Sequence, residues 1–80
     1  MASSELVLVT TYGCHFCDRA HEVLRELGVD AREIDVTTFE AGELAASGIP
    51  LAFLPVLTDG ERVLSYGRFS AKRLGRELER

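Results

Sequence analysis

The sequence predicts an α/β fold in which a four-stranded mixed sheet is flanked by helices on both faces. Three observations indicate it. An apolar, β-branched run near the start is typical of a strand buried on both faces, the next segment repeats apolar residues at helical spacing, and a second strand pattern follows. Strand, helix and strand within about 30 residues form a βαβ unit. We expect the order β-α-β-α-β-β-α in a single domain over residues 1–80.

The first three elements follow from apolar periodicity. Residues 6–11 form the apolar run, and residues 14–27 carry apolar side chains every three or four positions, which predicts a helix. Gly28 suits the left-handed end of that helix. Residues 29–36 alternate apolar and acidic side chains near their end, as half-exposed strands do. The two strands should pair in parallel with a right-handed crossover.

Caps and turns predict the remaining elements. Thr37 and Glu40 have capping-box spacing, so we expect a short helix that continues to about Ser47. The pair 59–60, Asp-Gly, lies between two apolar runs and predicts a hairpin with a two-residue turn, whose strands are antiparallel. Ser70 is the expected N-cap of the last helix.

Composition excludes several classes of protein. The chain has 80 residues, 46% of them hydrophobic, which is too short for a large multi-layer enzyme and too apolar for intrinsic disorder. The net charge is −4 and basic and acidic residues alternate without a basic stripe, so we expect no nucleic-acid partner. Without a membrane-spanning run or an export signal, we expect a soluble, cytoplasmic monomer that binds no membrane.

The two cysteines, Cys14 and Cys17, lie at the expected join of the first strand and the first helix. A disulfide across so short a loop stabilises little, so redox chemistry explains the pair better than cross-linking does. The free N–H groups and dipole of a helix N-terminus would stabilise a thiolate at Cys14. We expect Cys14 to be the exposed nucleophile and Cys17, one turn further on, to be the resolving thiol.

Other interpretations of the pair stay open at this point. The two thiols could be inert and buried. Cys14, Cys17 and His21 could supply three zinc ligands, although a structural zinc site needs a fourth. Two functional alternatives are a carrier of zinc or of an iron–sulfur cluster shared between two chains, and a binding module without catalysis. His15 is expected to face solvent and to support the Cys14 thiolate.

Four segments resemble the thioredoxin-like superfamily and, within it, the glutaredoxins. They are the Cys-x-x-Cys at 14–17, the second-strand signature at 33–38, the proline segment Phe-Leu-Pro-Val-Leu at 53–57 and Gly-Arg-Phe-Ser at 67–70. The resemblance extends over about residues 5–80. It implies a dithiol–disulfide oxidoreductase with no bound cofactor or metal, in which Cys14 attacks a substrate disulfide and Cys17 resolves the mixed disulfide.

The resemblance also implies a substrate-binding surface around the cysteines. The expected residues are Tyr12, His15, Phe16, Leu54, Pro55, Gly67, Arg68 and Ser70. We expect a cis bond between Leu54 and Pro55, which would bring the Leu54 backbone beside the cysteines to pair with a peptide or with glutathione. Pro50 is the weaker candidate for this role. Gly67 is expected to permit close approach of a ligand.

Three positions depart from the glutaredoxin pattern. Thr11 stands where Lys is usual, Arg68 replaces the second Gly of a Gly-Gly pair, and Ser70 replaces an Asp that accepts from the ammonium group of glutathione. Glu40 and Glu43 are negatively charged and unfavourable to the carboxylates of glutathione. The guanidinium of Arg68 could partly offset this effect. We expect weak dependence on glutathione. The expected partners are a disulfide substrate protein or glutathione, with reduction by glutathione or by a flavoenzyme of the thioredoxin reductase type.

Overall fold

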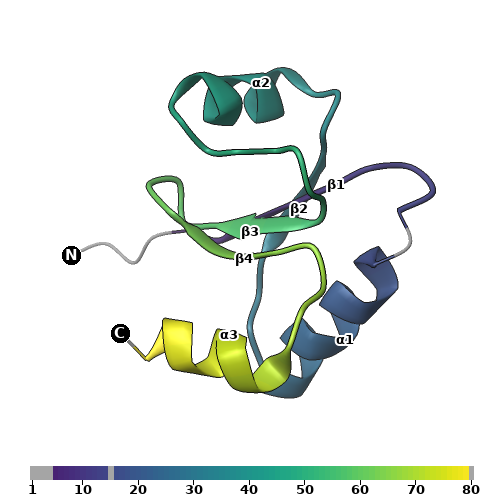
Figure 1. The fold of residues 1–80 in the computed structure, drawn as a ribbon, viewed down its shortest axis with the longest axis vertical. Helices are drawn as coiled ribbons and strands as arrows, with labels where there is room; N and C mark the ends of the chain where they lie inside the picture. Colours follow the sequence, from purple (N-terminus) through teal and green to yellow (C-terminus); the bar gives the residue numbers. More distant parts are fainter. Residues whose placement is uncertain (1–4, 15, 80) are drawn as a thin grey trace.

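The computed structural model describes residues 5–14 and 16–79. Its elements are β1 (Val7–Thr10), α1 (Cys17–Leu27), β2 (Arg32–Asp35), α2 (Phe39–Ala46), β3 (Val56–Thr58), β4 (Val63–Tyr66) and α3 (Ala71–Leu78) (Figure 1). The predicted order of strands and helices is confirmed. Within the described residues, no helix is long and apolar enough to cross a membrane.

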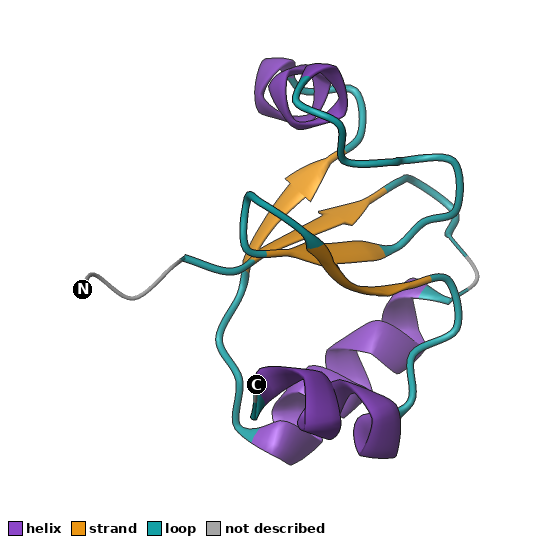
Figure 2. Cartoon of the chain, turned by 60° about the vertical axis from the view of Figure 1, so that its left-hand side comes forward, coloured by secondary structure: helices purple, strands orange, loops and turns teal. Residues whose placement is uncertain are grey.

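The four strands form one mixed sheet in the order β2-β1-β3-β4. β1 pairs in parallel with β2, with Val9 opposite Ile34, and pairs antiparallel with β3. β3 and β4 are antiparallel, as a hairpin requires. Figure 2 shows α2 on one face of the sheet and the other two helices on the opposite face. The predicted four-stranded sheet flanked by helices is therefore confirmed.

The core has two halves because successive side chains of β1 point to opposite faces of the sheet. Leu8 packs with Leu57, Phe69 and Leu74 beneath α1 and α3. Val7 and Val9 pack with Ala41, Ile49 and Val56 on the α2 side. Both halves bury residues of β1, which explains why this strand is apolar at every position before Thr10.

The first helix and the second strand are shorter than predicted. α1 begins at Cys17 rather than at residue 14, and Phe16 is its N-cap. The helix ends as expected, with Gly28 in the left-handed region at φ 67°. The Val29 N–H then donates to the Leu24 carbonyl at 2.9 Å, which closes the helix. The strand pairing of β2 starts at Arg32, whose N–H donates to the Leu6 carbonyl at 2.8 Å.

The predicted capping box is wrong by one residue. Thr38, not Thr37, is the N-cap of α2, and its hydroxyl accepts the Ala41 N–H at 3.2 Å. The Thr37 N–H and hydroxyl both donate to the Asp35 carboxylate. These bonds hold Thr37 in the turn before the helix and lower the pKa of Asp35. Glu40 therefore lies at the second helical position and does not reach back to the cap.

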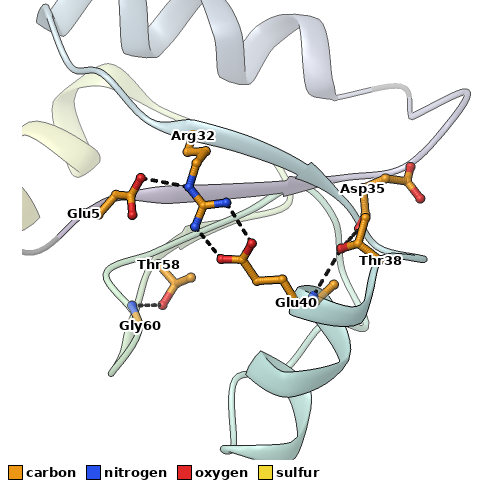
Figure 3. A network of polar contacts seen from close by, with 8 residues as sticks. Glu5, Arg32, Asp35, Thr38, Glu40, Thr58 and Gly60 are labelled. Carbon is orange, nitrogen blue, oxygen red and sulfur yellow. Dashed lines mark hydrogen bonds and ion pairs between the residues drawn. The ribbon is translucent and has the colours of Figure 1, made fainter.

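Glu40 instead joins α2 to the sheet through an arginine. The Arg32 guanidinium donates to both oxygens of Glu40 and, at 2.8 Å, to Glu5 (Figure 3). The hydrogen bond from Arg32 lowers the pKa of Glu40. One guanidinium thus connects the segment before β1, β2 and the first turn of α2. The charge of Glu40 is accordingly paired with that of Arg32.

The hairpin turn has four residues, 59–62, and not the two that were predicted. The Asp59 carboxylate accepts the N–H groups of Glu61 and Arg62 at 2.9 and 3.0 Å. The Thr58 hydroxyl accepts the Gly60 N–H (Figure 3). The same hydroxyl donates to the Arg62 carbonyl. The two side chains therefore supply the partners that a tight turn would have drawn from the strands.

The position of the α2 cap can be tested by two single changes. Thr38→Ala removes an N-cap hydroxyl, so it should lower the free energy of unfolding by about 1 kcal/mol. Thr37→Ala is the matched control and should have a smaller effect. Denaturant unfolding measures both. A larger loss in Thr37→Ala than in Thr38→Ala would contradict this assignment.

Candidate functional site

The cysteine pair lies where the central strand leads into the first helix. Cys14 is half-buried in the segment after β1, and its N–H donates to the Thr11 carbonyl at 3.2 Å. Gly13 turns the chain there with a φ of 74°, in the left-handed region. Cys17 is the first residue of α1 and is only 9% exposed. Both thiols are free, and Cys14 is the more accessible of the two.

Because α1 begins later than predicted, Cys14 lies outside the helix. The sequence placed Cys14 in the first turn of the helix, but it precedes the first helical residue by three positions. The N–H groups of the first turn therefore belong to Cys17 and the residues after it. Cys14 lies before the helix and Cys17 lies within it.

The Cys17 thiol keeps its proton at neutral pH. The pKa of Cys17 is raised to about 11, chiefly by burial and next by a side-chain hydrogen bond with Cys14. A hydrogen bond with the Thr11 backbone opposes this, while negative charge on Cys14 and Glu33 adds to it. A bond that raises a thiol's pKa is one that the protonated form donates. Cys17 is thus close enough to Cys14 for a side-chain hydrogen bond that favours the protonated form of Cys17.

A carboxylate that sequence reasoning missed lies close to this thiol. Glu33, on β2, is near enough for its charge to raise the pKa of Cys17. One of its oxygens lies 3.0 Å from His21 Nε2, and the other accepts the hydroxyl of buried Thr10 at 3.1 Å. His21 is four residues after Cys17 on α1, so both occupy the same side of the helix. These bonds hold Glu33 beside the cysteine pair.

The zinc interpretation of His21 finds no support in this geometry. The imidazole of His21 is bound to Glu33. Among residues 5–14 and 16–79, no three His, Cys, Asp or Glu side chains are grouped so that they could hold a metal ion. His21 is a half-buried residue of α1.

Three of the expected binding residues line one hollow of about 450 Å³. It is lined by Phe16, Arg19, Arg68, Phe69 and Ser70, at the start of α1 and before α3. Phe16 is 38% exposed, and the two arginines are exposed. The Ser70 hydroxyl accepts the Arg73 N–H at 3.3 Å as the N-cap of α3, as predicted. An anionic group with an apolar part fits this combination of aromatic and cationic side chains.

The proline segment has the expected backbone form. The Leu54–Pro55 bond is cis, which confirms the prediction, and Pro55 is buried. The Gly67 N–H donates to the Pro55 carbonyl at 2.9 Å, which joins two of the expected segments. Gly67 has a φ of 65°, and a Cβ there would meet nothing within 4 Å. Its backbone conformation alone therefore accounts for glycine. Leu54 is half-buried against the α2 side of the core.

Tyr12, another expected residue, is not part of either arrangement. Tyr12 is 98% exposed and projects from the segment before Cys14. His15 lies outside the described residues. Pro50, the alternative to Pro55, is exposed and lines a groove along β4.

The comparisons with known proteins fit this architecture. Residues 8–65 match the family model of the glutathione S-transferase N-terminal domain, a match that includes both cysteines and the cis proline. The chain belongs to this family. As a glutathione S-transferase N-terminal type of domain, it has the thioredoxin-like fold that the sequence predicted. None of the curated proteins compared with the chain matches it.

The influence of Glu33 on Cys17 can be measured directly. In Cys14→Ser, where Cys17 is the remaining thiol, its pKa should stay above the ordinary value of about 8.5 because burial persists. Adding Glu33→Gln removes a negative charge and should lower that pKa. The cysteine Cβ chemical shift followed against pH reports both values. Glu43→Gln, on the α2 side of the sheet, is the control. A rise in the pKa of Cys17 on Glu33→Gln would contradict the proposed influence of the Glu33 charge.

Proposed function

We propose that this protein is a dithiol–disulfide oxidoreductase that reduces protein or small-molecule disulfides through Cys14 and Cys17. The observation that carries the proposal is the pairing of a free, half-buried Cys14 with a free, buried Cys17 at the start of α1. Membership of a glutathione-related family with a thioredoxin-like fold supports a thiol-dependent role.

The reaction has two exchange steps. The Cys14 thiolate attacks one sulfur of the substrate disulfide, forms a mixed disulfide and releases the other sulfur as a thiolate. Cys17 loses its proton and attacks the Cys14 sulfur, which releases the second substrate sulfur and leaves a Cys14–Cys17 disulfide. Two electrons pass from the dithiol to the substrate, and two protons complete the substrate thiols. No bound cofactor or metal takes part in either step.

The first step prepares the second. In the mixed disulfide the Cys14 sulfur bears no negative charge and no longer stabilises the protonated Cys17 by a strong hydrogen bond. Two of the causes that raise the pKa of Cys17 are therefore removed once Cys14 has reacted. Glu33, held by Thr10 and His21, is the nearby base to receive the proton. Cys17 is thus activated after attack and not before it.

The electron donor is proposed from the groups available to bind glutathione. Thr11 offers no cation, and the Ser70 hydroxyl is used to cap α3, so neither supplies a charge to the tripeptide. Arg68 and Arg19 border the hollow beside the cysteines and could hold one carboxylate. We propose a weak dependence on glutathione, with a flavoenzyme of the thioredoxin reductase type as the main reductant of a cytoplasmic protein.

Single cysteine variants test the division of roles. Cys14→Ser should abolish disulfide reduction because it removes the nucleophile. Cys17→Ser should accumulate a mixed disulfide because the resolving thiol is gone. Insulin reduction measures the activity, and mass spectrometry detects the adduct. Faster alkylation of Cys17 than of Cys14 in the reduced protein would reverse the assignment.

A single cation tests the source of electrons. Thr11→Lys adds a charge-assisted contact beside the cysteines, which should raise turnover with glutathione and glutathione reductase about tenfold. Turnover with thioredoxin reductase and NADPH should not rise. Thr37→Lys, before α2, is the matched control. If the unaltered protein already turns over with glutathione like an ordinary glutaredoxin, and Arg68→Gly has no effect, glutathione is held by other residues.

A further inference from the structure

A groove of about 830 Å³ runs along β4, and neither cysteine lines it. Its walls come from all of β4, from α3 and from Pro50 in the segment before β3. Four arginines line it, namely Arg62, Arg68, Arg73 and Arg76. We call this the arginine groove. Nothing in the proposed exchange chemistry requires it.

The arginine groove is rich in positive charge, whereas the chain as a whole is negatively charged. The net charge is −4, yet residues 62–76 contain no acidic residue and five of the nine basic ones. Glu77 is the one carboxylate that lines the groove, and it is paired with Arg62 at 3.1 Å. Within residues 5–14 and 16–79, no carboxylate forms an ion pair with the other three arginines. Their charges are therefore available to an anionic ligand.

The backbone at this place is also available to a ligand. β4 is an edge strand, because the sheet order ends with it. An edge strand leaves N–H and C=O groups without partners on its outer side, and an extended peptide can pair with them. In Figure 1, β4 passes above α3, which carries Arg73 and Arg76. An extended chain on β4 would thus lie next to these guanidinium groups.

One residue connects the arginine groove with the hollow at the start of α1. Arg68 lines both the groove and the hollow that contains Phe16 and Ser70. At the same end of β4, Tyr66 is opposite Val56, the residue after the cis proline. The exposed rings of Tyr66 and Phe53 lie 6.4 Å apart there. A chain that follows β4 toward Arg68 therefore arrives at the hollow lined by Phe16, the residue before Cys17.

We propose that the arginine groove binds an extended, acidic segment of the protein whose disulfide is reduced. This inference rests on the proposed function and names its substrate class. The acidic residues of the partner lie in sequence next to its reactive disulfide, pair with the arginines and add a strand to β4. A nucleic acid is a poorer fit, because the acidic residues elsewhere on the chain repel a long polyanion and an open strand edge offers it no matching backbone.

Reduction of designed peptides tests the proposal. The probes are a peptide disulfide preceded by four glutamates, the same peptide with four glutamines, and bis(2-hydroxyethyl) disulfide. Arg73→Glu with Arg76→Glu should raise KM and lower kcat/KM for the acidic peptide about tenfold, with little change for the other two substrates. Lys72→Glu with Arg25→Glu makes the same change in charge outside the groove, and should alter all three substrates by less than twofold. If the charge-reversed variant Arg73→Glu with Arg76→Glu does not fold, the neutral variant Arg73→Gln with Arg76→Gln takes its place in the same comparison.

Binding separates this proposal from the exchange chemistry. The acidic peptide with both cysteines replaced by serine, followed by fluorescence anisotropy, should bind the unaltered protein, and the groove variants should lose that binding. If the protein reduces no disulfide but binds this peptide, the proposed oxidoreductase function is wrong and the proposed role of the groove is supported. If the groove variants lost activity equally toward the acidic and the glutamine peptides, the proposed role of the groove would be wrong. It would also be wrong if the protein bound a DNA oligonucleotide of equal charge more tightly than the acidic peptide.

Discussion

Burial of β1 on both faces is the constraint on which the rest of the structure depends. Leu8 faces α1 and α3, while Val7 and Val9 face α2, so this one strand joins both halves of the core. It also pairs with β2 on one side and β3 on the other. The strand ends at buried Thr10, from which the chain leads directly to Cys14. The cysteines are thus attached to the most constrained strand of the protein.

The order of elements could be predicted because it depends on apolar periodicity, but their ends depend on particular hydrogen bonds. Thr37 and Thr38 are chemically identical candidates for one cap, and only the capture of Thr37 by Asp35 selects between them. Asp-Gly suggested a tight turn, but the Asp59 carboxylate accepts two N–H groups further along and lengthens it. Competition between neighbouring polar groups cannot be resolved from residue types alone.

The candidate site divides in the same way. Cys14, Cys17 and the cis proline lie in local patterns that the sequence displays. Glu33 does not, since its place beside Cys17 depends on strand register and on the rotation of α1 that brings His21 to it. The arginine groove was also missed, because the charges were considered over the whole chain. The fold brings Arg62 from the hairpin turn to the same groove as Arg73 and Arg76 on α3.

The protonated state of Cys17 has a consequence for exposure to oxidants. Peroxides react with thiolates, so a buried thiol with a pKa of about 11 is protected from them at neutral pH. Oxidation would then fall on the more accessible Cys14. A sulfenic acid formed there would lie beside the Cys17 sulfur, with which it can condense to a disulfide and release water. Oxidative damage would end in the same Cys14–Cys17 bond that a reductant can open.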